Sequence, residues 1–137
     1  MFPVVMPHST YTVSPEHLKD AKTIADAGNG LFCTHAAETK AEQADIQNRY
    51  GQTVIRHMSA HHLLGERTVL AHCVHVDERE IDLMAKSGTT VVHNPMSNLK
   101  LASGIAPTIK MQTAGVRLTL GTDGAISGND LDMWLAM

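Results

Sequence analysis

The stretch Leu31-Phe32-Cys33-Thr34-His35-Ala36-Ala37-Glu38 decides the fold class expected for this chain. Its first four residues are apolar or β-prone and predict a short buried strand that stops at a histidine. A glutamate follows three residues later. This order places an imidazole and a carboxylate at one edge of a sheet.

The same pattern, a short apolar strand followed at once by a polar side chain, recurs three times. The strands and the residues that follow them are 68–71 with His72, 89–92 with His93, and 117–122 with Asp123. Short strands that end in metal-binding or proton-transferring residues are typical of a parallel α/β sheet whose active site lies at the carboxyl ends of its strands.

Helical patterns separate these strands, and glycines stand at the joins. Ser14 and Pro15 predict a helix start, and Asp77 followed by Glu80 is a capping-box pattern. The expected helices are 15–27, 40–50, 53–64, one between Asp77 and Gly88, one from Pro107, and one from Asp130. We expect a first short strand over 2–6 and a loop over 94–101. Alternating strands and helices predict a parallel sheet wrapped by helices.

Composition excludes several function classes. The chain has 137 residues, a net charge of −3 and no basic run, and only 4% of its residues are aromatic. These values argue against a nucleic-acid surface. No apolar run approaches the ~20 residues of a membrane span, and residues 1–6 lack the charged start of a signal peptide. Cys33 and Cys73 are expected to be buried free thiols, so we expect a cytoplasmic protein.

Chain length limits the architecture. About five strands are expected, whereas a (β/α)₈ barrel needs ~250 residues and at least ~200. The chain is therefore either a small open sheet or the back half of a barrel. We treat residues 1–137 as one domain.

His35, His72 and Asp123 are the strongest candidates for function. They are far apart in the chain, and only a shared edge of strand ends would bring them together. Zinc accepts imidazole nitrogen and carboxylate oxygen, and a catalytic zinc keeps a position for water. One such histidine alone would favour a packing role, but three histidines and one aspartate at equivalent strand ends make that less plausible.

Other candidates have two readings that spacing does not separate. Glu38 is either a proton-transfer group or a structural residue, namely a solvated loop acid or the cap of the helix that follows it. His8 either contacts a substrate or belongs to a simple turn. A structural role is favoured for the remaining helical or helix-edge histidines, which are His17, His57, His61, His62 and His75.

The chain resembles the amidohydrolase superfamily, and within it the methylthioadenosine/S-adenosylhomocysteine deaminases and the related triazine chlorohydrolases. The stretches that carry this resemblance are 7–9 with Tyr11 and Ser14, 35–39, 71–75, 92–95 with 97–104, and 121–125. The runs Ser97-Asn-Leu-Lys-Leu101 and Gly121-Thr-Asp-Gly-Ala125 are quite specific for this branch.

The resemblance implies strands four to eight of a (β/α)₈ barrel. It implies that His35 and Asp123 are zinc ligands, and that Glu38 and His72 transfer protons around the substrate, with Asp123 as a third catalytic group. His8 would contact the substrate, and His93 and Asn94 would support its binding. Iron or another divalent metal is the alternative to zinc.

The family's His-x-His zinc pair on the first strand has no counterpart here. We therefore expect the isolated chain to bind metal weakly or not at all. Half a barrel exposes sheet edges and apolar faces, so we expect no stable monomer but a homo-oligomer or completion by the missing half.

The function expected from these observations is a zinc-dependent deaminase of a small aminopurine nucleoside. Two alternatives stay open. One is a triazine chlorohydrolase or guanine deaminase on the same scaffold, and the other is a metal-free fragment without catalytic activity.

Overall fold

A single parallel sheet organises the chain in the computed structural model, which describes residues 3–129 and 131–137. Its five strands are β1 Val4–Val5, β2 Leu31–Ala36, β3 Thr68–His72, β4 Thr90–His93 and β5 Arg117–Leu120. They lie side by side in the order of the sequence, and every neighbouring pair is parallel. All carboxyl ends therefore meet at one edge of the sheet.

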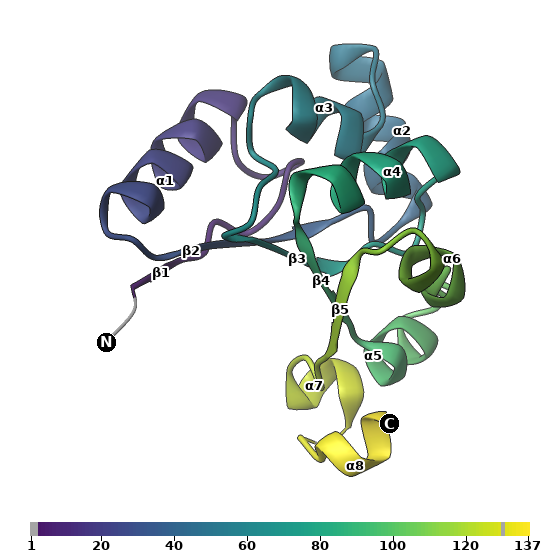
Figure 1. Cartoon of the computed structure of the whole chain (residues 1–137). Helices are drawn as coiled ribbons and strands as arrows, with labels where there is room; N and C mark the ends of the chain where they lie inside the picture. The colour runs from purple at the N-terminus through teal and green to yellow at the C-terminus, as the bar shows by residue number, and fades with distance from the viewer. Residues whose placement is uncertain (1–2, 130) are drawn as a thin grey trace.

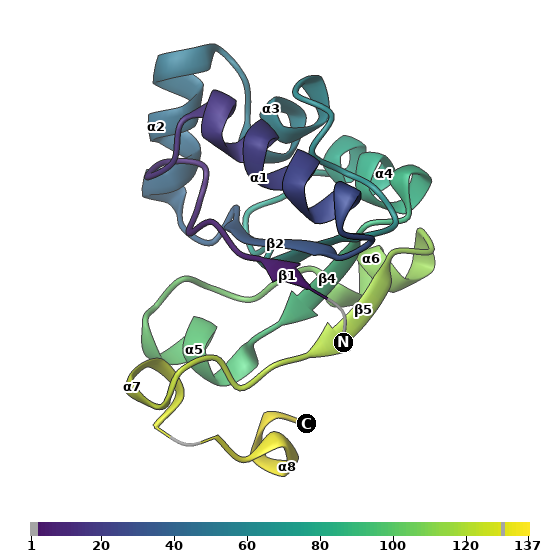
Figure 2. The same ribbon diagram turned by 90° about the vertical axis from the view of Figure 1, so that its left-hand side faces the viewer.

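Helices connect the strands. They are α1 Pro15–Ala27, α2 Lys40–Tyr50, α3 Val54–Ala60, α4 Glu78–Ser87, α5 Pro95–Lys100, α6 Thr108–Thr113, α7 Ala125–Gly128 and α8 Met133–Ala136. Figures 1 and 2 show α1 to α4 grouped on one side of the sheet, while α5, α7 and α8 gather near the ends of β4 and β5. None of the helices in the described ranges has the length and hydropathy that crossing a membrane requires.

The two faces of the sheet differ in burial. Phe32, Leu70 and Val91 are fully buried and join the hydrophobic core under the helices. Their neighbours Cys33 and Val69 point the other way and line an open pocket. Parallel sheets are normally covered on both faces. The chain thus covers one face and leaves the other accessible.

Local sequence signals place several elements correctly. Ser14 caps α1 by accepting the His17 N–H, and α2 spans the expected residues 40–50. Asp77 and Glu80 form the predicted capping box at α4. Both cysteines are free thiols: Cys73 is buried, whereas Cys33 is only half-buried.

Several boundaries were predicted wrongly, and β3 and β4 each include the histidine that was expected to follow them. β2 continues through His35 to Ala36, because His35 pairs with Ala71 in the ladder. The helix expected over 53–64 ends at Ala60, where His62 adopts a left-handed backbone and the Leu63 N–H returns to the Met58 carbonyl. β5 ends at Leu120, three residues before Asp123.

The loop expected over 94–101 is also wrong, since residues 95–100 form α5. Pro95 occupies the first turn, where its missing N–H costs nothing. The Asn98 N–H donates to the Asn94 carbonyl over 2.9 Å. Two expectations fall on residues outside the described ranges: Asp130 as a helix start, and Phe2 in the first strand. The last described helix, α8, is capped by Asp132.

Removing the Asp77 cap should destabilise the chain measurably. The Glu80 N–H donates to Asp77 Oδ1 over 2.9 Å, and the Asp77 N–H donates to Glu80 Oε2 over 3.0 Å. We expect Asp77→Ala to lower the free energy of unfolding by about 1 kcal/mol, measured by urea unfolding at one fixed protein concentration. Asp82→Ala, on the exposed side of the same helix, is the control. Equal effects of both substitutions would contradict the capping role.

His57 is a buried imidazole in the helical layer. It is 2% exposed, stacks on Tyr50 at 4.3 Å between ring centroids, and its Nε2 has no hydrogen-bond partner. Burial, assisted by the positive charges of His61, Arg49 and Lys19, lowers the pKa of His57 to about 4. The fold therefore favours the neutral ring.

Acid should weaken the fold through His57. In the unfolded chain a histidine has a pKa of about 6.5, so the unfolded state takes up the proton first as the pH falls. The stability gained from a neutral His57 is therefore complete above about pH 6.5 and is lost as the pH falls toward the folded pKa of about 4. We expect His57→Phe to flatten the pH dependence of the free energy of unfolding in this range, measured by urea unfolding. His17→Gln, at an exposed position, should leave that pH dependence unchanged. An unchanged pH dependence in His57→Phe would contradict the assignment.

Candidate active site

His35 is oriented by the chain segment that follows β1. Its backbone N–H and its Nδ1 both lie within hydrogen-bond distance of the His8 carbonyl, at 3.0 and 2.7 Å. A carbonyl oxygen can only accept, so Nδ1 carries the proton and the Nε2 lone pair is free. This arrangement is typical of a histidine prepared to bind a metal ion.

His8 itself lies beside this ring. Its Nδ1 is 2.8 Å from Thr12 Oγ1, and its ring centroid is 5.2 Å from that of His35. The His8 side chain is exposed. It can therefore be reached by a molecule that enters from the open side.

His72 is the last residue of β3 and is 1% exposed. Its ring stacks on His35, with centroids 5.4 Å apart and planes at 25°. Nδ1 is 2.8 Å from Asn98 Oδ1, and Nε2 is 3.9 Å from Glu38 Oε2. The His72 backbone has a φ of 75°, a left-handed conformation that is rare outside glycine.

Asp123 also has a left-handed backbone, with φ 60°. Its Oδ2 accepts from the Ser97 hydroxyl over 2.7 Å, and its Oδ1 accepts from the Gly124 N–H over 2.8 Å. Burial alone would raise the pKa of Asp123, but the hydrogen bonds from Ser97, Gly124 and Ser127 and the nearby His72 together lower it. Asp123 is therefore held as a carboxylate.

Glu38 does not cap α2. Thr39 does, because its hydroxyl accepts the Glu42 N–H over 3.1 Å. Glu38 Oε1 instead accepts from the Ser103 hydroxyl over 3.3 Å, and Oε2 faces His72. The helix-capping role that the sequence left open for Glu38 is therefore excluded.

Glu42 is a buried carboxyl that sequence reasoning missed. It is 4% exposed, its Oε2 accepts from the Glu38 N–H over 2.8 Å, and its Oε1 accepts from the Thr10 hydroxyl over 2.9 Å. Burial raises the pKa of Glu42 despite these hydrogen bonds. The Thr39-to-Glu42 spacing, a capping-box pattern, is the signal that could have found it.

His93 and Asn94 lie where β4 ends. The buried Nδ1 of His93 has no hydrogen-bond partner, and burial, followed by the charge of His72, lowers the His93 pKa. Asn94 is 4% exposed, and its side chain packs against Gly121. Asn94 therefore lines the open pocket, whereas His93 is not among the residues that line it and lies near His72.

One open pocket collects these strand ends. His35, Asn94 and Asp123 line it, together with Met6, Cys33, Thr34, Val69, Ala71, Val92, Gly121, Thr122 and Met133. Its floor is the uncovered face of the sheet. The structure thus brings His35 and Asp123 into one pocket, with His72 stacked behind His35 and Glu38 beside His72.

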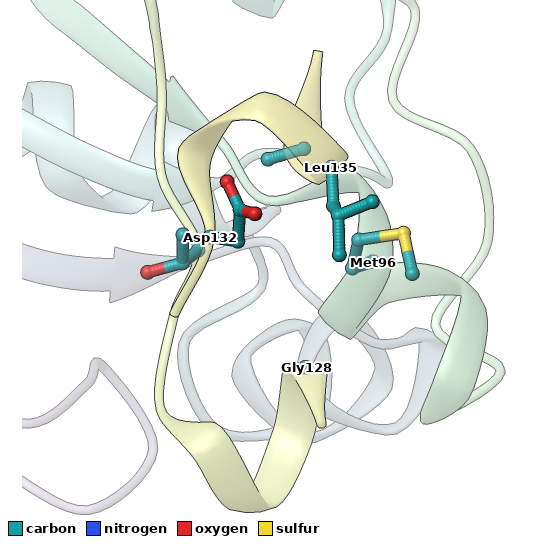
Figure 3. Close-up of a pocket in the computed structure, with 6 residues that line it drawn as sticks. Met96, Gly128, Asp132 and Leu135 are labelled. Carbon is teal, nitrogen blue, oxygen red and sulfur yellow. The ribbon is translucent and has the colours of Figure 1, made fainter. Parts of the chain in front are cut away.

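A second, smaller pocket lies between α5 and α8 and is lined by Met96, Gly128, Asp132 and Leu135, with Thr122 and Ala136 (Figure 3). Among the described residues that line it, Asp132 is the only ionisable one, and Asp132 Oδ1 already accepts the Trp134 N–H as a helix cap. These lining residues therefore place no histidine, cysteine or second carboxylate beside Asp132.

The metal-binding potential of the open pocket is partial. His35 offers a free Nε2 and Asp123 offers a carboxylate, and zinc accepts both donor types. Within residues 3–129 and 131–137, no group of three or more His, Cys, Asp or Glu side chains is placed to hold a metal ion. Two donors fit such a site, and further ligands would have to come from elsewhere.

Comparison with known proteins defines the family. The sequence profile of the Amidohydrolase family matches residues 1–137, so the chain belongs to this family. The chain is 49% identical over 127 residues to a 5-methylthioadenosine/S-adenosylhomocysteine deaminase of Carboxydothermus hydrogenoformans. It is 42% identical over 127 residues to a 5'-deoxyadenosine deaminase of Methanopyrus kandleri. These matches cover 93% of the chain but only 29% and 30% of the relatives.

Solved structures give the same picture. An adenosine deaminase from Xanthomonas campestris with bound zinc superposes with a TM-score of 0.92 at 40% identity, over 96% of this chain and 30% of that one. E. coli guanine deaminase superposes with a TM-score of 0.90 at 28% identity, over 98% of this chain and 32% of that one. An atrazine chlorohydrolase from Arthrobacter aurescens with zinc superposes with a TM-score of 0.87 at 25% identity, over 92% of this chain and 28% of that one. The neighbours are barrel amidohydrolases, and this chain has the fold of part of one.

Gly121 should be intolerant of any side chain. A Cβ there would lie 2.7 Å from Val92 Cγ1 and would collide with Asn94 Oδ1. We expect Gly121→Ala to displace Asn94 and to lower the melting temperature by several degrees, because overpacking typically costs about 1–3 kcal/mol. The control is Gly124→Ala, whose Cβ would meet only Ser127 Oγ at 3.8 Å. Equal melting temperatures for both variants would contradict this packing.

Proposed function

We propose that the chain forms part of a metal-dependent deaminase that acts on an adenosine-type nucleoside such as methylthioadenosine, S-adenosylhomocysteine or 5'-deoxyadenosine. The observation that carries the proposal is the group formed by His35, His72, Glu38 and Asp123 at one edge of the sheet. The relatives with 42–49% identity are deaminases of these nucleosides. Their substrates are a more specific guide than the guanine and triazine enzymes at 25–28% identity.

In this proposal residues 1–137 are one piece of a (β/α)₈ barrel and supply its strands four to eight. The uncovered face of the sheet would then be the barrel interior. This placement is supported by the close superposition over 96% of the chain and only 30% of the Xanthomonas campestris enzyme. It also accounts for the half-buried residues Cys33, Val69 and Ala71 on that face.

His35, through Nε2, and Asp123, through its carboxylate, are the proposed ligands of this chain for zinc or another divalent metal. Zinc bound in the Xanthomonas campestris and Arthrobacter aurescens structures supports this choice. Such a metal would supply an acidified water as the nucleophile. The remaining ligands would lie outside these 137 residues.

The side chains of this chain would manage the protons. Glu38 would protonate a ring nitrogen of the substrate next to the carbon that loses its amino group, and the Ser103 hydroxyl holds Oε1 for that task. His72 would exchange a proton at Nε2, the ring nitrogen that faces Glu38. Asp123, kept ionised by Ser97 and Gly124, can accept a proton during the reaction.

Three further residues would contact or shape the substrate site. His8 is exposed beside His35 and would contact the nucleoside. His93 and Asn94 would form the wall at the end of β4. Their part is to orient and enclose the substrate, and hydrolysis would proceed through the groups described above.

A chimera tests this function. Residues 3–137 would replace the matching stretch of the Carboxydothermus hydrogenoformans relative, which supplies the rest of the protein. We expect zinc binding and ammonia release from methylthioadenosine, S-adenosylhomocysteine or 5'-deoxyadenosine, and loss of both on treatment with a chelator. A folded, zinc-loaded chimera that deaminates none of the three would contradict the substrate class. Turnover of guanine or atrazine alone would favour the alternative enzymes instead.

Glu38→Gln in the chimera should lower kcat by about 100- to 10,000-fold, because an amide cannot deliver the proton. The melting temperature should stay close to that of the parent chimera, since Gln can still accept from Ser103. Glu78→Gln, on the exposed first turn of α4, is the matched control and should retain full activity. A Glu38→Gln chimera with parental kcat would remove Glu38 from the mechanism.

A further inference from the structure

Three residues of the segment 97–103 are buried polar neighbours of the site. Ser97, Asn98 and Ser103 are 0, 1 and 6% exposed. Buried polar side chains persist where they have specific hydrogen-bond partners. Here each partner is one of the groups that the proposed function uses.

The first two residues reach to both sides of β4. Ser97 Oγ donates to Asp123 Oδ2 over 2.7 Å, and Asn98 Oδ1 lies 2.8 Å from His72 Nδ1. They can do so because α5 follows β4, and β4 lies between β3 and β5 in the sheet. Adjacent residues of α5 thus contact the ends of both neighbouring strands.

The third residue holds Glu38. Ser103 Oγ donates to Glu38 Oε1 over 3.3 Å, while the Ser103 N–H donates to the Asn98 carbonyl over 2.9 Å. The Ser103 carbonyl accepts from His75 Nε2 over 2.8 Å. Both backbone groups of Ser103 are therefore paired, which fixes the place of its hydroxyl.

We infer that Ser97, Asn98 and Ser103 are positioning residues, and that Asn98 fixes the tautomer of His72. An amide oxygen can only accept, so His72 Nδ1 carries the proton and Nε2 alone is left to exchange protons with Glu38. The buried Asn98 Nδ2 has no partner, a cost that an apolar residue would avoid. What the site gains from Asn98 is its acceptor oxygen.

The meaning of this tautomer for catalysis rests on the proposed deaminase function, but the tautomer itself does not. It can be read from the ¹⁵N shifts of the imidazole nitrogens in the 137-residue chain without metal, at mildly alkaline pH, where imidazoles are neutral. His72→Gln assigns the signals. We expect wild-type His72 to carry its proton at Nδ1.

Substitutions separate this role from simple packing. Asn98→Leu should shift the His72 proton from Nδ1 to Nε2, whereas Asn98→Asp, which keeps an acceptor oxygen, should leave it at Nδ1. Asn48→Leu, at an exposed position on α2, is the control and should change nothing. A wild-type His72 protonated at Nε2, or an unchanged tautomer in Asn98→Leu, would overturn the inference. The wild-type spectrum tests the inference even if Asn98→Leu does not fold. This test is also independent of whether the chimera is active.

Discussion

The parallel register between β2 and β3 is the constraint on which the site depends. His35 pairs with Ala71 and Ala36 pairs with His72, so the two histidines lie on neighbouring strands one step apart. In a regular ladder two residues one step apart point to opposite faces, so the stacking of their rings also depends on the left-handed backbone of His72, where β3 ends. A shift of one residue in either strand would turn the side chains of that strand to the opposite face and break this arrangement.

Local backbone geometry, in addition to the register, determines where the side chains of the site point. His72 and Asp123 both have positive φ, which non-glycine residues adopt only where the surrounding structure compensates for the strain. Hydrogen bonds hold the two side chains in place: Asn98 Oδ1 accepts from His72 Nδ1, and the Ser97 hydroxyl donates to Asp123 Oδ2. Gly121 contributes by lacking a side chain, since any Cβ would collide with Asn94. The strand ends thus converge through register, strain and close packing together.

The sequence was sufficient where local chemistry decides the structure. Gly51 ends α2, and α4 begins at the Asp77 cap and ends at Gly88, as the local sequence predicted. The parallel order of the strands followed from the alternation of strand and helix patterns, and the strand-end histidines predicted the edge of the sheet where the candidate site lies.

Prediction from the sequence failed where contacts between residues far apart in the chain determine the structure. Residues 94–101 were predicted to form a loop, because nothing in the local pattern shows that Ser97 and Asn98 meet Asp123 and His72 across the sheet. Glu42 was missed for a similar reason, since its contacts with Thr10 and the Glu38 backbone join separate segments. The extension of β2 through His35 depends on pairing with β3, which one strand alone does not reveal.

The central claim is that His35 and Asp123 bind one metal ion at the mouth of the open pocket. A crystal structure of the zinc-loaded chimera, with anomalous data at the zinc edge, tests it most directly. The account predicts one strong anomalous peak about 2.0–2.2 Å from both His35 Nε2 and a carboxylate oxygen of Asp123. A zinc ion bound without either residue, with their side chains turned toward separate pockets, would contradict it.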